Sequence, residues 1–153
     1  MESKRLFGSG PKCLITGIIL VLIAYFLDSF LSIPRIHIPN ASANIIFIIS
    51  IILTISLIVG GFISLPVNKR GKELVTNKAF KYIRHPIYAG LLDFFVFGLG
   101  FYLKSYTVII AGIVLIFVCG KIVDSEERYL IERFGHKYRD YQRTTKKFIP
   151  WVY

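Results

Sequence analysis

Four apolar runs constrain most strongly how this chain can fold. They comprise residues 13–31, 44–66, 87–103 and 106–123, and each is long enough, or nearly so, to cross the roughly 30 Å apolar core of a bilayer. Of the 153 residues, 54% are hydrophobic, which is typical of an integral membrane protein rather than a soluble one. We therefore predict an all-α integral membrane protein with about four transmembrane helices in one domain, residues 1–153.

The connections between the runs refine this prediction. Only Lys104 and Ser105 separate the third run from the fourth, so these two helices should form a tight antiparallel hairpin. The first run follows basic residues, as a secretory signal would, but it is longer than usual and no small-residue cleavage pattern ends it. We expect it to be a membrane anchor. In the third run, Gly98 and Gly100 indicate close helix packing rather than nucleotide binding.

The positive charge gathers in segments that would share one side of the membrane. The formal net charge is +10, and with a cytoplasmic N-terminus only Arg35 and Lys104, of 19 Lys and Arg residues, lie outside. The positive-inside rule then places both termini in the cytoplasm. The excess charge is thus a topology signal that would hold the inner face against anionic membrane lipids, and we expect no nucleic-acid partner.

Few residues suggest a metal or redox site. Cys13 and Cys119 lie in predicted spans without a metal or redox spacing, so we expect free, buried thiols. The three histidines are too scattered for a metal site, and we expect no metal. Two carboxylates fall within spans, where an acid is a functional candidate by default. We expect Asp28 to reach water at the outer end of its helix, and for Asp93 a role in a polar cavity is left open.

The stretch Tyr82–Gly90 places a cationic and aromatic cluster directly before the third apolar run. Pro86 suits the first turn of a helix, because its missing N–H is no loss there. Arg84 and His85 then lie where a helix meets water, near backbone N–H groups that favour anions. This place is suited to a charged cofactor, although the loop alone also fits an interfacial segment at headgroup depth.

A second polar segment, residues 124–153, follows the fourth run. A helix is predicted to continue out of the membrane as far as Gly135, with Asp124, Glu126 and Glu127 in its first exposed turn. These acids either face solvent, where Asp124 could pair with Arg128, or contribute to a site. The aromatic and basic end of the chain, which includes Phe148 and Trp151, predicts an interfacial anchor, with a lid over a cofactor as the alternative.

Taken together, these segments resemble the isoprenylcysteine carboxyl methyltransferase family and the related phospholipid methyltransferases. The resemblance covers roughly residues 66–153. It is carried, in order, by Leu74-Val75-Thr76, Phe80 to Gly90, Glu126-Glu127, Leu130, Phe134-Gly135, Tyr138, Tyr141 and Pro150. The family consists of small integral membrane enzymes that use S-adenosylmethionine at the cytoplasmic side without a Rossmann fold.

The resemblance implies roles for individual residues. Residues 67–86 would form a loop that binds S-adenosylmethionine. The cofactor pocket would be lined by Leu74, Val75, Phe80, His85, Pro86 and Tyr88 and closed by Glu126; the catalytic candidates are Arg84, His85 and Glu127, and the substrate candidates are Lys121, Ile122 and Asp93. This chain departs from the family at two positions. It has Phe80 where the family commonly has Tyr, and Lys78 where the family usually has Gly. Ile122 stands where enzymes that methylate prenylated cysteine carry Arg, so the acceptor differs or Lys121 substitutes for that Arg.

The leading interpretation is therefore an S-adenosylmethionine-dependent methyltransferase. Its acceptor would be a lipophilic small molecule or lipid that presents a carboxylate, thiol or amine at the cytoplasmic membrane face. The alternative is a non-catalytic membrane protein that keeps the fold as a lipid-binding or partner-binding module. Cofactor binding by the purified protein distinguishes the two, while the sequence leaves the acceptor and the oligomeric state open.

Overall fold

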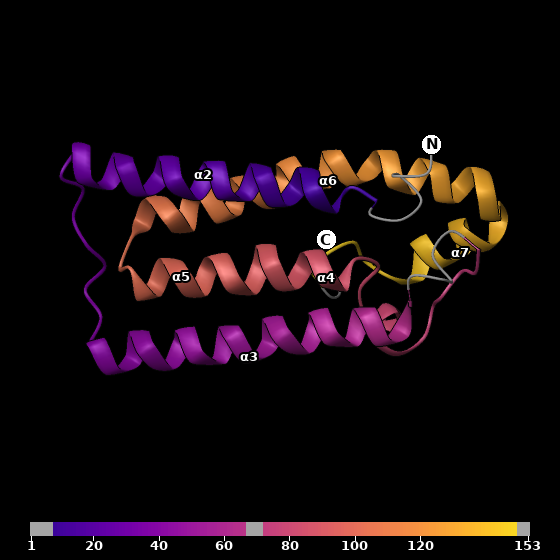
Figure 1. Cartoon of the computed structure of the whole chain (residues 1–153), viewed down its shortest axis with the longest axis horizontal. Helices are drawn as coiled ribbons and strands as arrows, with labels where there is room; N and C mark the ends of the chain where they lie inside the picture. Colours follow the sequence, from indigo (N-terminus) through magenta and orange to yellow (C-terminus); the bar gives the residue numbers. More distant parts are fainter. Residues whose placement is uncertain (1–7, 67–71, 150–153) are drawn as a thin grey trace.

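The computed structural model describes residues 8–66 and 72–149, and this part of the chain is mostly helical (Figure 1). Its elements are α2 (Gly10–Phe30), α3 (Asn40–Ser64), the 3-10 helix η2 (Lys78–Lys81), α4 (Pro86–Ala89), the π-helix η3 (Gly90–Phe95), α5 (Val96–Tyr102), α6 (Tyr106–Phe134) and α7 (His136–Thr144). Helices α2, α3 and α6 are long and apolar enough to cross a membrane, and α4, η3 and α5 form a shorter apolar helix, Pro86–Tyr102. The predicted all-α membrane fold is confirmed.

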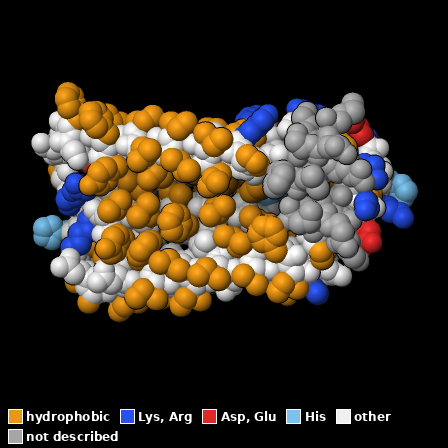
Figure 2. Space-filling view, viewed as in Figure 1, with side chains coloured by type: hydrophobic (Ala, Val, Ile, Leu, Met, Phe, Trp, Pro, Cys, Tyr) orange, Lys and Arg blue, Asp and Glu red, His pale blue; other side chains and the backbone are white. Residues whose placement is uncertain are grey.

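The long helices run side by side. Helix α2 packs against α6, α3 packs against α4, η3 and α5, and α5 also packs against α6 (Figure 1). Large apolar side chains such as Phe26, Phe30, Ile52 and Ile63 face outward from α2 and α3. Hydrophobic side chains cover the middle of the visible face, and Lys and Arg lie toward its two ends (Figure 2). Such a large exposed apolar surface is expected of a protein that sits in lipid.

The predicted hairpin between the third and fourth apolar runs is present. Lys104 adopts a positive φ of 53° in the turn, and the Ser105 side chain caps α6 by accepting a hydrogen bond from the Val108 N–H at 2.9 Å. A Cβ on Gly100 would lie 2.6 Å from the Ile109 side chain, so the two helices approach closely because this residue has no side chain.

Helix α3 approaches the third apolar helix closely at the π-helix η3. The Thr54 hydroxyl donates to the Gly90 carbonyl at 2.9 Å, and a Cβ on Gly90 would lie 3.1 Å from the Thr54 carbonyl oxygen. Asp93 lies in η3, and one of its carboxylate oxygens is buried without a hydrogen-bond partner among the described residues. A π-turn of this kind re-aims the side chains that follow it.

The prediction that Asp28 reaches water is wrong. Asp28 is only 3% exposed. The Arg35 guanidinium and the Thr107 hydroxyl both donate hydrogen bonds to its carboxylate. Arg35 also donates to the Leu103 carbonyl, so this cluster joins the connection after α2 to the α5–α6 hairpin. Asp28 is therefore a buried, fully paired acid. The predicted free, buried thiols of Cys13 and Cys119 are confirmed.

The chain after α7 returns to the segment that precedes α4. Ile83 and Lys146 form an isolated parallel bridge, and the Arg84 and His85 N–H groups donate to the Lys146 and Lys147 carbonyls at 2.8 and 3.1 Å. We call residues 145–149 the strap. Phe148 is 0% exposed within it, so the prediction of an interfacial anchor is wrong for this residue. Trp151 and the rest of the predicted anchor or lid lie outside the described residues.

Helix α6 continues beyond the apolar run as predicted. It extends without a break from Tyr106 to Phe134 and ends at Gly135, which has a φ of 60°. The last turns of α6, together with α7 and the strap, form a cap over one end of the bundle (Figure 1). This cap carries the acidic residues that the sequence singled out.

Candidate functional site

A cavity of about 390 Å³ lies where the capped end meets the bundle. Its walls come from the start of α2, the end of α3, the segment that leads into α4, the last turns of α6, and α7. It is lined by Gly8, Gly10, Pro11, Leu14, Gly61, Phe62, Leu65, Glu73, Leu74, Val75, Phe80, Arg84, His85, Pro86, Ile87, Tyr88, Glu126, Tyr129, Leu130, Phe134, Tyr138 and Tyr141. The volume and the mainly apolar, aromatic lining are typical of a small-molecule site.

The structure brings the predicted cofactor residues together at this cavity. Leu74, Val75, Phe80, His85, Pro86, Tyr88 and Glu126 all line it. Of the predicted loop 67–86, residues 67–71 lie outside the described part of the chain. Pro86 begins α4 as expected, so the chain turns from the loop into the helix at the cavity wall.

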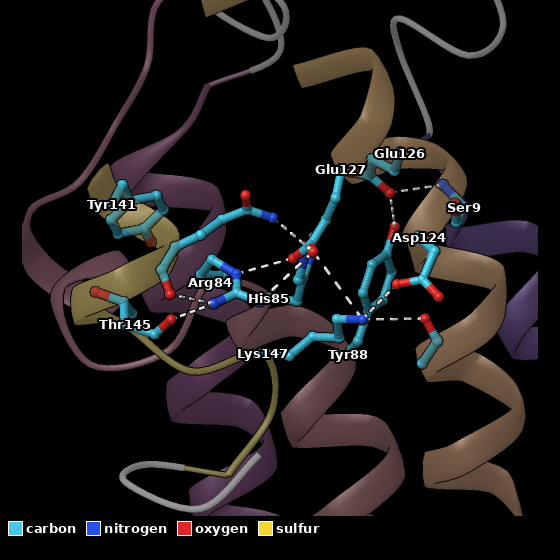
Figure 3. Close-up of polar contacts among 12 residues, drawn as sticks. Ser9, Arg84, His85, Tyr88, Asp124, Glu126, Glu127, Tyr141, Thr145 and Lys147 are labelled. Atoms are coloured by element: carbon cyan, nitrogen blue, oxygen red, sulfur yellow. Dashed lines mark hydrogen bonds and ion pairs between the residues drawn. The ribbon is translucent and has the colours of Figure 1, made fainter. Parts of the chain in front are cut away.

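Glu126 is held at the cavity wall by two donors from other elements. Its Oε2 accepts hydrogen bonds from the Ser9 N–H at 2.9 Å and from the Tyr88 hydroxyl at 3.1 Å (Figure 3). Among the described residues no hydrogen bond reaches Oε1. The carboxylate is thus fixed at the cavity wall through Oε2.

The segment before α2 contributes to this arrangement, which the sequence reasoning missed. Gly8 has a φ of +54°, and a Cβ there would lie 2.7 Å from Glu126 Oε2. Only glycine therefore lets the backbone approach the carboxylate this closely. The small residues of Gly8-Ser9-Gly10 before Pro11 were the available signal, since such a run permits close contact, but the sequence alone does not say with what.

Glu127 forms a buried cluster behind the cavity wall. It accepts from Arg84 Nε at 2.8 Å and from the Gln142 side-chain amide at 2.9 Å, and its Oε1 lies 3.1 Å from His85 Nε2 (Figure 3). Burial raises the pKa of this carboxyl, but hydrogen bonds and charge from His85 and Arg84 outweigh burial and lower the pKa to about 2. Glu127 is therefore ionised at neutral pH and fixes Arg84 and His85, which do line the cavity.

Arg84 connects three parts of the cap. Besides its bond to Glu127 on α6, its Nη1 donates to the carbonyls of Gln142 on α7 and Thr145 in the strap. These contacts occupy much of the guanidinium fork, which is the feature that makes Arg an anion ligand. The geometry therefore gives Arg84 a positioning role in addition to its place on the wall.

Lys147 attaches the strap to α6. Its Nζ donates to Asp124 Oδ1 at 2.6 Å and to the Gly120 carbonyl at 3.2 Å. Asp124 thus pairs with the strap rather than with Arg128, the partner that helical spacing suggested. This contact joins residues 23 positions apart, and a pattern of helix spacing cannot predict it.

Another part of the cavity wall is aromatic, and Tyr141 there lies across Arg84 and His85 from Glu126 (Figure 3). Tyr141 is buried, and its hydroxyl donates to the Phe80 carbonyl. The ring of Tyr138 meets that of Tyr141 edge-on, with centroids 5.9 Å apart. Burial raises the pKa of both phenols, so both are neutral at physiological pH. Phe80, Tyr138 and Tyr141 therefore offer ring surfaces without charge.

The three predicted substrate residues are not brought to this cavity. Lys121 is exposed, Ile122 packs against the hydrophobic core, and Asp93 lies in η3; none is among the described residues that line the cavity. The Ile122 carbonyl instead accepts a hydrogen bond from the Ser9 hydroxyl, with an O···O distance of 3.3 Å. Within residues 8–66 and 72–149, no group of three or more His, Cys, Asp or Glu side chains could hold a metal ion.

Curated proteins similar to this chain are methyltransferases. A protein-S-isoprenylcysteine O-methyltransferase of Schizosaccharomyces pombe is 31% identical over 90 residues, which is 56% of this chain and 37% of the relative. One of Dictyostelium discoideum is 31% identical over 80 residues, 52% of this chain and 34% of the relative. Methanethiol S-methyltransferase 1 of Bradyrhizobium diazoefficiens is 33% identical over 76 residues, 50% of this chain and 26% of the relative. No protein-family model matches the chain.

These similarities confirm the resemblance drawn from the motifs. The chain is related to the isoprenylcysteine carboxyl methyltransferase family through about half of its own length. It spans only about a third of the length of the two isoprenylcysteine enzymes that it matches.

Proposed function

We propose that this protein binds S-adenosylmethionine in the cavity and transfers its methyl group to a lipophilic acceptor at the cytoplasmic membrane face. The observation that carries the proposal is that all seven residues expected to bind the cofactor line one cavity. The relatives are named for methyl transfer to different acceptors, isoprenylcysteine and methanethiol. Methyl transfer is the chemistry they share, so the proposal leaves the acceptor to experiment.

The side chains of the cavity fit the cofactor's parts. The uncharged rings of Phe80, Tyr138 and Tyr141 suit a purine base. The Glu126 carboxylate lies across Arg84 and His85 from Tyr141 (Figure 3) and suits an ammonium group. Because the sulfonium loses its positive charge during methyl transfer, a carboxylate against the sulfonium would favour the reactant. We therefore assign Glu126 to the ammonium group, which keeps its charge.

When bound, S-adenosylmethionine would supply an electrophilic methyl group, which a carboxylate, thiol or amine of the acceptor attacks in line while S-adenosylhomocysteine leaves as a neutral thioether. The chain contributes position and a dry environment. The Arg84–Glu127 pair and the strap hold His85 against Tyr88, with ring centroids 5.5 Å apart. A wall fixed in this way needs little rearrangement for the reaction, and exclusion of water favours a reaction that neutralises charge.

The acceptor is proposed to approach from the lipid. Leu14 of α2 and Phe62 of α3 line the cavity, yet they are 50% and 47% exposed on helices apolar enough to span a membrane. An apolar acceptor could pass between these side chains while its tail stays in the bilayer. The cap then covers the cavity from the water side.

We propose that the cavity faces the cytoplasm. Of the 19 Lys and Arg residues, 17 lie before the first apolar run, between the second and third runs, or at and beyond the end of the fourth, and the described parts of these segments contribute to the cavity wall. A reporter fused after Tyr153 is expected to behave as cytoplasmic. An exoplasmic signal from that fusion would contradict the orientation without affecting the cavity assignment.

The activity is tested by incubating purified protein in nanodiscs with methyl-labelled S-adenosylmethionine and either total membrane lipids or small thiols. We expect label to appear in an extractable lipophilic product. Transfer should fall at least tenfold in Glu126→Gln, while Glu132→Gln, an exposed acid on the same helix, should behave as the unmodified protein. Cofactor binding without transfer to either acceptor pool would favour the non-catalytic alternative.

A further inference from the structure

Tyr138 carries a buried hydroxyl that no described residue pairs with. The residue is 2% exposed and lines the cavity, and its hydroxyl has no hydrogen-bond partner among the described residues. Two other tyrosines on the cavity wall differ in this respect. Tyr88 donates to Glu126, and Tyr141 donates to the Phe80 carbonyl.

A buried hydroxyl without a partner is unfavourable at this position. Burying a hydroxyl without a partner removes its hydrogen bonds to water and returns nothing. Phenylalanine would fill the same space without that cost. The hydroxyl therefore indicates a partner that enters the cavity, since the described part of the chain supplies none.

The position of Tyr138 indicates which part of a ligand it meets. Its ring contacts that of Tyr141, whose hydroxyl donates to the Phe80 carbonyl, so Tyr138 adjoins an aromatic part of the cavity wall. Figure 3 shows Tyr141 and Glu126 on opposite sides of Arg84 and His85. A ligand with a cation near Glu126 would place its uncharged, ring-containing part beside Tyr138.

We propose that the Tyr138 hydroxyl hydrogen-bonds a polar atom of the adenosine moiety of S-adenosylmethionine. The inference rests on the proposed function and adds to it a binding residue and the part of the ligand that this residue recognises. The neutral phenol can either donate to a ring nitrogen or accept from a ribose hydroxyl.

The test compares Tyr138→Phe with Tyr141→Phe, since both remove one buried hydroxyl from the same helix. Calorimetric titration with S-adenosylhomocysteine and with 5′-methylthioadenosine, which lacks the amino-acid part, measures binding in nanodiscs. Thermal unfolding without ligand measures stability. For Tyr138→Phe we expect about three- to tenfold weaker binding of both probes and an unfolding temperature that does not fall. Tyr141→Phe should lower the unfolding temperature, because it leaves the Phe80 carbonyl unpaired.

Two results would overturn the inference. Unchanged binding of S-adenosylhomocysteine by Tyr138→Phe, whatever its unfolding temperature, would show that the hydroxyl contacts no ligand. Weaker binding of S-adenosylhomocysteine alone, with normal binding of 5′-methylthioadenosine, would place the contact at the amino-acid part. If the unmodified protein binds neither probe, the proposed function itself fails, which is a separate and distinguishable outcome.

Discussion

Glu127→Ala is expected to destabilise the folded protein by about 3–5 kcal/mol, the usual cost of removing one partner from a buried ion pair. The substitution removes the carboxylate that lies 2.8 Å from Arg84 Nε and leaves the guanidinium charge without this partner. It also removes the contacts of Glu127 with His85 and Gln142. In a thermal unfolding experiment this corresponds to a fall of about 6–20 °C for a chain of this size.

Asp140→Ala serves as the matched control for Glu127→Ala. Asp140 also pairs with an arginine, Arg143, but both side chains are exposed and the distance is 3.5 Å. We expect no measurable change in its unfolding temperature, because exposed pairs contribute little. Equal effects of the two substitutions would show that the Glu127 cluster does not hold the cap together.

Glu126→Gln is expected to weaken S-adenosylmethionine binding at least tenfold, about 1.4 kcal/mol, with little loss of stability. The amide keeps an oxygen that can accept from Ser9 and Tyr88, but it removes the charge that we assign to the ligand's ammonium group. Binding of 5′-methylthioadenosine, which has no ammonium group, should change little. Equal weakening of both ligands would show that Glu126 shapes the cavity rather than recognising charge.

The helices could be predicted because their cause is local. Runs of apolar residues determine where a chain can cross a membrane, and Gly135 and the Lys104-Ser105 turn mark helix ends in the sequence itself. The helix bounds accordingly differ from the predicted spans by only a few residues at most ends, apart from the predicted extension of α6.

The site could be predicted only where its residues lie in a recognisable order. His85 and Glu126 were found through motif spacing, whereas Ser9 reaches Glu126 across 117 positions and depends on how α2 packs against α6. Asp28 and Phe148 were misassigned for the same reason. Their burial is caused by Arg35, Thr107 and the return of the strap, none of which is visible in the residues beside them.

The location of the cofactor site is tested most directly by photochemical cross-linking. Purified protein in nanodiscs is irradiated with labelled S-adenosylmethionine, with and without excess S-adenosylhomocysteine, and the labelled peptides are sequenced. We predict label that the competitor suppresses, confined to peptides that carry the cavity wall, from residues 8–14, 61–65, 72–90 and 126–141. Competitor-sensitive label only in segments that do not line the cavity, or none at all in folded protein, would contradict the assignment of this cavity to S-adenosylmethionine.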